Sequence, residues 1–113
     1  MIVENTQTQM RKGILEYCIL SIISRKEIYA SDIINELKKA QLLVVEGTLY
    51  PLLTRLKNNG LLSYNWVEST SGPPRKYYML TAAGLQVLEF LDKTWTELVF
   101  AVNTSIEDRQ INL

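Results

Sequence analysis

The chain has 113 residues, of which 47% are hydrophobic and 21% charged, a balance typical of one globular domain. Twelve basic and twelve acidic side chains give a formal net charge of zero, so the overall charge does not point to a nucleic-acid partner. The single cysteine excludes an internal disulfide and a cysteine-based zinc site, and the lack of histidine removes the commonest metal ligand and general base.

The first predicted element is a helix over residues 8–24, preceded by frayed polar residues at 1–9. Its apolar residues recur in pairs at helical spacing, as Ile14/Leu15, Cys18/Ile19 and Ile22/Ile23. Glu16 interrupts this run and no small-residue cleavage site follows, which argues against a signal peptide. The run is also too short to span a membrane. We therefore expect a cytoplasmic protein with Cys18 packed as an apolar side chain; redox sensing is the alternative.

A turn is predicted over residues 25–28, followed by a second helix from Ser31, or the residue before it, to about Ala40. A third helix is predicted over residues 46–59. Its apolar face is formed by Leu49, Leu52, Leu53 and Leu56. Because proline is tolerated only in the first turn of a helix, Pro51 suggests that the regular helix begins close to Gly47–Thr48.

The period then changes to two, which predicts a strand. Leu62, Tyr64 and Trp66 share one side, and Ser63, Asn65 and Val67 share the other. "TSGPP" predicts a turn and "RKYYML" a second strand, so we expect a hairpin with a Gly-Pro-Pro tip. Thr81 is predicted to cap a last helix over residues 82–103.

Three helices, a hairpin and a long helix predict a mainly α fold with a small β-hairpin. We expect a winged helix-turn-helix DNA-binding domain over residues 1–80 and a C-terminal dimerisation helix with a short tail over residues 81–113. In this architecture the third helix enters the major groove of double-stranded DNA, and the hairpin, or wing, lies against the backbone or the minor groove.

The charge distribution supports DNA binding. Residues 38–80 hold six basic and two acidic side chains, a net charge of +4, whereas the flanking segments carry −1 and −3. Thr48 and Tyr50 offer polar groups at the start of the third helix. Cations on the same helix and on the wing are Arg55, Lys57, Arg75 and Lys76. Such side chains are usually only solvated charges, but their joint placement on two DNA-binding elements favours a DNA interface.

Two segments, "GTLYPLLTRLKNNGLL" and "GPPRKYYMLTAAG", resemble the signature of the PadR family of bacterial transcriptional regulators. The resemblance implies a winged-helix homodimer that binds operator DNA, usually as a repressor. At matching positions it implies DNA contacts by Thr48, Tyr50, Arg55, Arg75 and Lys76, and a weaker one by Lys12. The chain departs from the family at Ala30-Ser31, where Gly-Tyr is preferred, and at Val45, where a capping serine is common.

The last helix is more apolar than a small domain needs. A seam of the coiled-coil type is formed by Leu88, Leu91, Trp95, Leu98 and Val102. Other faces carry Leu85, Val87, Phe90, Val99 and Phe100. A helix that is apolar on more than one face is buried on more than one side, so we expect a homodimer formed through this helix and the first helix. Trp95 is an interface or core aromatic; the resemblance adds the alternative that it binds a flat aromatic effector, as in family members that sense drugs.

We therefore expect a dimeric, sequence-specific DNA-binding repressor that is released by a small-molecule effector. The alternative is a winged-helix protein-interaction module without specific DNA binding. An enzyme is disfavoured, because the sequence has no phosphate-binding glycine loop and no metal-ligand cluster, and Glu36 and Glu46 are ordinary helical carboxylates. We expect no cofactor, no metal and no membrane partner.

Overall fold

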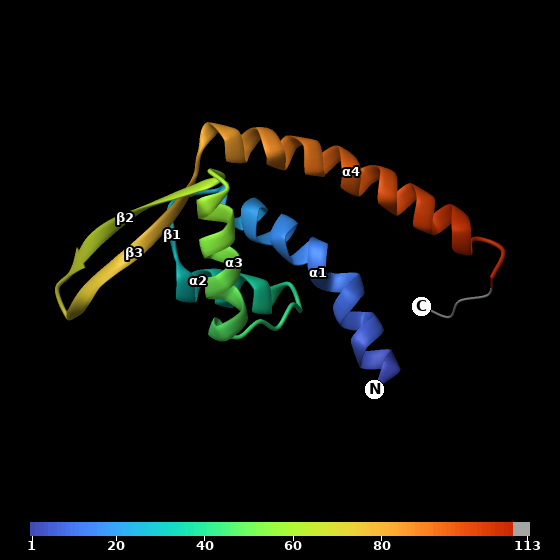
Figure 1. The fold of residues 1–113 in the computed structure, drawn as a ribbon, viewed down its shortest axis with the longest axis horizontal. Helices are drawn as coiled ribbons and strands as arrows, with labels where there is room; N and C mark the ends of the chain where they lie inside the picture. Colours follow the sequence, from blue (N-terminus) through green and yellow to red (C-terminus); the bar gives the residue numbers. More distant parts are fainter. Residues whose placement is uncertain (110–113) are drawn as a thin grey trace.

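The computed structural model describes residues 1–109, which form a winged helix-turn-helix domain that continues into one long helix (Figure 1). The elements are α1 (Ile2–Ile23), β1 (Ile28–Tyr29), α2 (Ala30–Lys39), α3 (Glu46–Asn58), β2 (Leu62–Ser69), β3 (Gly72–Leu80) and α4 (Ala82–Ile106). The expected fold class is confirmed. The last part of the predicted tail, residues 110–113, lies outside the described residues. None of the described helices is both long and apolar enough to cross a membrane.

Helix α1 begins earlier than predicted. It starts at Ile2, so the prediction of frayed residues at 1–9 is wrong. The Thr6 hydroxyl donates to the Ile2 carbonyl at 2.9 Å, and the Thr8 hydroxyl donates to the Glu4 carbonyl at 3.0 Å. These bonds satisfy the polar side chains within the helix itself. The first half of α1 is exposed and projects away from the domain, as Figure 1 shows in blue.

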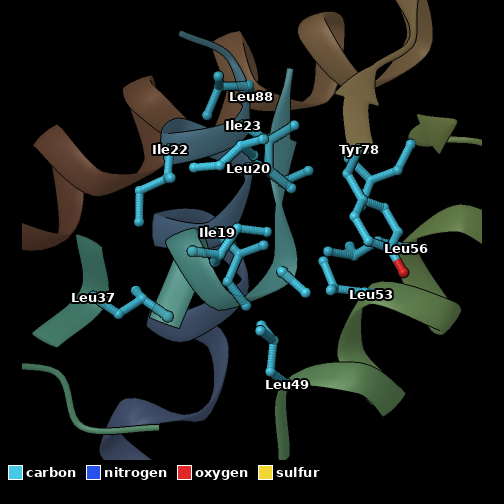
Figure 2. Close-up of a cluster of buried hydrophobic side chains, with 14 residues drawn as sticks. Ile19, Leu20, Ile22, Ile23, Leu37, Leu49, Leu53, Leu56, Tyr78 and Leu88 are labelled. Carbon is cyan, nitrogen blue, oxygen red and sulfur yellow. The ribbon is translucent and has the colours of Figure 1, made fainter. Parts of the chain in front are cut away.

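The hydrophobic core lies where α1, α2 and α3 meet the sheet and the start of α4. Figure 2 shows its side chains converging from these elements. The largest fully buried ones are Ile19, Leu20, Ile23, Ile33, Leu37, Leu49 and Leu53. Full burial of each such side chain stabilises the fold by about 1.5–3 kcal/mol before entropy is counted. The predicted apolar face of α3 is confirmed at Leu49, Leu53 and Leu56, whereas Leu52 is only half-buried.

The sheet contains a strand that the sequence did not predict. Strand β1 pairs antiparallel with β3, through Ile28 with Tyr78 and Tyr29 with Tyr77, so the strand order is β1-β3-β2. The predicted turn over residues 25–28 is therefore wrong at its last residue. A strand of two residues has no measurable period, and only its partner in space defines it. Tyr29 also serves as the N-cap residue of α2.

The wing turns at Thr70 and Ser71, so the predicted Gly-Pro-Pro tip is wrong. Gly72 pairs with Ser69 and opens β3, which places Pro73 and Pro74 inside the strand. Prolines are accepted here for two reasons. The register shifts between Val67 and Ser69, and β1 pairs with β3 only farther along, so the outer wing has a free edge.

Helix α3 begins at Glu46, earlier than we inferred from Pro51. The amides of Thr48 and Leu49 both donate to the Val45 carbonyl at 3.0 Å, so Val45 is the N-cap residue and Pro51 lies inside the helix. Proline has no N–H to bond the carbonyl four residues earlier, that of Gly47. Both residues are exposed, so the missing bond lies at the surface, where burial adds no further cost.

Helix α4 begins as predicted, because the Thr81 hydroxyl accepts a hydrogen bond from the Gly84 amide at 3.0 Å. The same hydroxyl donates to the Gly60 carbonyl at 2.6 Å and so joins α4 to the end of α3. Leu88 is only 6% exposed and belongs to the domain's own core. Its assignment to the dimer seam is therefore corrected: the first turns of α4 cover the domain, and only the later turns extend beyond it (Figure 1).

Candidate nucleic-acid interface

The exposed start of α3 lies beside two cations of α1. A groove of about 420 Å³ separates the helices and is lined by Thr8, Arg11, Lys12, Leu15, Gly47, Thr48, Pro51 and Leu52. The structure thus brings together Thr48 and Lys12, two predicted DNA contacts that are distant in sequence. It adds Arg11, which we did not predict although it precedes Lys12. Free amides at a helix N-terminus and nearby cations favour phosphate.

Tyr50 lies on the second turn of α3 and is exposed. Partial burial raises the pKa of its phenol, and the negative charge of Glu46 raises it further. The hydroxyl is therefore protonated at neutral pH and available as a hydrogen-bond donor as well as an acceptor.

Arg55 forms an ion pair with Glu16, which lies on α1. The pair joins α3 to α1, and the Arg55 side chain is about half exposed. A guanidinium has five N–H donors, so one carboxylate leaves others unused. A contact between Arg55 and DNA stays a prediction, now with a neighbouring carboxylate that opposes it.

Lys57 of α3 and Lys76 of β3 both lie against the Tyr64 ring of the wing. Their ammonium groups lie 5.6 and 4.3 Å from the centre of the Tyr64 ring. Lys76 also lies 5.2 Å from the Trp66 ring, which contacts Tyr64 edge-to-face at 6.2 Å. The end of α3 and the wing therefore share one aromatic and cationic surface.

Arg75 lies on the opposite face of the wing from Lys76, because successive side chains of a strand alternate. Its guanidinium carbon is 4.9 Å from the centre of the Tyr29 ring, and Tyr29 contacts Tyr77 with 5.9 Å between ring centres. The two predicted wing contacts are thus not a single cluster. Each face of the wing carries one cation held on aromatic rings.

A second groove, of about 340 Å³, runs between α1 and α4. It is lined by Met10, Gly13, Ile14, Tyr17, Leu91, Thr94, Trp95 and Leu98. The ring centres of Trp95 and Tyr17 lie 6.5 Å apart, and the Tyr17 hydroxyl donates to Asp92 Oδ1 at 2.6 Å. This hydrogen bond to a carboxylate raises the pKa of Tyr17. In the single chain, Trp95 therefore lines an open apolar groove and is not part of the closed core.

Two further observations concern the thiol and the acidic side chains. Burial raises the pKa of the Cys18 thiol, which lowers its thiolate fraction and favours a packing role over redox sensing. Within residues 1–109, no three cysteine, aspartate or glutamate side chains are grouped as they would be to hold a metal ion.

Comparison with known proteins relates this chain to a family of transcriptional regulators. The model of a family described as "Transcriptional regulator PadR-like family" matches residues 19–90. The crystal structure of a PadR-like transcription factor from Bacteroides fragilis is 62% identical, with 88% of this chain and 97% of that chain covered and a TM-score of 0.76. For a PadR-like transcriptional regulator from Bacillus cereus, the identity is 39%, the coverages are 89% and 99%, and the TM-score is 0.80. Bacillus subtilis PadR, solved in complex with operator DNA, is 26% identical, with coverages of 69% and 45% and a TM-score of 0.64.

Proposed function

Because the chain belongs to the PadR-like family of transcriptional regulators, we propose that it is a dimeric, sequence-specific DNA-binding repressor released from its operator by a small-molecule effector. The observation that carries the proposal is the gathering of cations around α3 in a chain of zero net charge. Lys12 of α1 lies beside the start of α3, Lys57 lies in the last turn of α3, and Lys76 lies on the wing. The protein would act in the cytoplasm, without cofactor or catalytic activity.

In the proposed complex, α3 lies in the major groove and presents Thr48 and Tyr50 to the base edges. Lys12 and Arg11 bind phosphates beside its start, and Arg75 and Lys76 bind phosphates from the wing. The Bacillus subtilis relative, which was solved in complex with operator DNA, supports DNA as the partner.

The proposed dimer forms through the later turns of α4. Trp95, Leu98 and Val102 are 42%, 49% and 53% exposed, although all three lie on the predicted apolar seam. A contiguous apolar surface of this kind marks an interaction site, and a second copy of the seam matches it in chemistry. Residues 1–80 would then bind DNA, and residues 81–113 would set the distance between the two DNA-binding domains.

The proposed effector is a flat aromatic molecule that stacks on Trp95 in the α1–α4 groove. Since this groove touches both α1 and α4, a ligand there could change how the two subunits are spaced. It shifts the equilibrium only if it binds the DNA-free form of the dimer more tightly than the DNA-bound form.

Selection of binding sites from random-sequence duplexes with the purified protein tests the proposal. We expect enrichment of a two-fold symmetric site, as a dimer requires. The logarithm of the binding constant should fall linearly with the logarithm of the salt concentration, with a slope of about −0.9 for each phosphate neutralised. No enrichment and no salt-dependent binding would favour the alternative, a winged-helix module that binds proteins instead of DNA.

A further inference from the structure

The outer part of the wing carries an exposed aromatic side chain that the proposed function does not use. Trp66 is 63% exposed, although its ring packs edge-to-face on Tyr64. Tyr64 in turn contacts Tyr78, with 6.0 Å between ring centres, and Tyr78 is buried in the core. A chain of aromatic contacts therefore anchors Trp66 to the domain and holds one side of its ring toward solvent.

Two ammonium groups lie against this aromatic cluster: that of Lys76 lies over the Trp66 and Tyr64 rings, and that of Lys57 lies over the Tyr64 ring. Lys76 is the cross-strand partner of Trp66, and Lys57 reaches Tyr64 from the last turn of α3. None of the ion pairs within residues 1–109 involves either lysine. The nearest acidic residue along β2 is Glu68, two positions farther toward the tip, where the register shifts. Both positive charges therefore lie against the Tyr64 ring, and neither has a carboxylate partner among the described residues.

We propose that Trp66, Lys57 and Lys76 form one contact with the sugar-phosphate backbone of duplex DNA. The indole packs against a deoxyribose, and the two ammonium groups bind the phosphates on either side of it. This inference rests on the proposed DNA-binding function and adds a residue and a division of labour to it. Two unpaired ammonium groups attract a polyanion, and the sugar between successive phosphates offers the exposed ring an apolar partner.

The position of this contact follows from the fold. Because Lys57 belongs to α3, the surface continues directly from the helix that enters the major groove to the wing. A sugar carries no base identity, so the contact contributes affinity for any duplex and little sequence preference. Arg75, on the opposite face of the wing, would contact a different part of the DNA backbone.

Single substitutions on the two faces of β2 separate this contact from a general effect on the wing. Trp66→Ala removes the ring, Trp66→Phe keeps a smaller one, and Val67→Ala changes the neighbouring exposed side chain on the other face. Binding is measured by fluorescence anisotropy with a labelled duplex from the selection and with an unrelated duplex of equal length, over a range of salt concentrations. Circular dichroism confirms that each variant is folded.

We expect Trp66→Ala to weaken binding to both duplexes about tenfold with an unchanged salt slope, since the ring carries no charge. Trp66→Phe should recover part of the loss, and Val67→Ala should bind as the wild type does. Lys57→Ala and Lys76→Ala should each reduce the magnitude of the salt slope by about one.

The emission of Trp66 provides a second readout, which does not depend on replacing Trp66 itself. In a Trp95→Phe background whose dimer mass and salt-dependent DNA binding match those of the wild type, addition of the duplex should shift or quench the remaining tryptophan emission. If wild-type protein binds DNA but Trp66→Ala retains its affinity and the emission does not change, this contact is refuted and the proposed function stands. If the wild type shows no salt-dependent binding, both fail.

Discussion

The carbonyl oxygen of Leu61 occupies the space that a side chain at Gly84 would need: a Cβ atom built there would lie 2.1 Å from it. The same carbonyl accepts a hydrogen bond from the Thr81 amide at 3.1 Å. Helix α4 therefore begins in direct contact with the backbone at the start of the wing. This contact sets the direction in which α4 leaves the domain, and so the placement of its exposed apolar seam.

Gly84→Ala should lower the free energy of unfolding by about 1–3 kcal/mol, because the overlap with a backbone atom can be relieved only by moving α4. Urea unfolding followed by circular dichroism measures this. Gly13→Ala is the matched control, since Gly13 is exposed in α1 and a Cβ there would meet nothing within 4 Å. It should be neutral or add up to about 1 kcal/mol through helix propensity. Equal stability of both variants would disprove the close contact.

Gln41→Gly should stabilise the domain by about 0.5–1 kcal/mol. Gln41 follows Ala40, the C-cap residue of α2, with φ at +68°, a left-handed conformation that glycine adopts without steric cost. Gly60 follows Asn59, the C-cap residue of α3, with φ at +78°, and a Cβ there would meet nothing within 4 Å. Gly60→Ala should therefore lose a similar amount for purely conformational reasons. A loss of stability on Gln41→Gly would show that the Gln41 side chain is needed there.

Removing the carboxylate beside Arg55 tests whether that arginine also reaches DNA. Glu16→Gln should tighten binding to any duplex a few-fold, because it removes the negative charge that opposes a phosphate, and Arg55→Ala should reduce the magnitude of the salt slope by about one. Glu36→Gln is the control, since Glu36 pairs with Arg25 and Lys39 on the α2 side of the domain. If neither Glu16→Gln nor Arg55→Ala changes DNA binding, Arg55 serves only to pair with Glu16 of α1. An ion pair this exposed contributes about 0–1 kcal/mol to stability.

Leu98→Glu should convert the dimer to a monomer at micromolar concentration, because burying an unpaired carboxylate in the seam costs several kcal/mol. Thr104→Glu adds the same charge to α4 at an exposed position outside the seam and should leave the dimer intact. Light scattering gives the mass of each variant. A monomeric wild type would contradict both the dimer and the two-fold symmetric operator.

Planar aromatic molecules should quench Trp95 emission in a saturable way when Trp66→Phe removes the other tryptophan. Each stacked pair is worth about 0.5–1.5 kcal/mol beyond the area buried, so affinities should respond to ring size. Phe90→Ala, an exposed aromatic outside the groove, should leave the titration unchanged. If no planar compound quenches the emission, Trp95 serves only packing at the interface.

Local features of the chain were readable from the sequence. The period of the apolar residues located the four helices and two of the strands, and the Thr81 cap and the apolar face of α3 follow from neighbours a few residues apart. Alternation along β3 also implies that Arg75 and Lys76 point to opposite faces. The predicted range 46–59 for α3 agrees with the structure, but Pro51 lies in the second turn and not in the opening turn, because a proline costs little at this exposed position.

Only the tertiary structure decided which distant residues share a site. Strand β1 forms because Ile28 and Tyr29 pair with β3. Leu88 is buried because the first turns of α4 pack on its own domain. Packing between the helices and the sheet places Lys12 beside the start of α3 and Lys57 beside Tyr64 of the wing. Helix periods and caps depend on backbone hydrogen bonds within a few residues, so the sequence alone determined the elements. Ion pairs, stacked rings and grooves depend on the packing of separate segments, so they were decided by the fold.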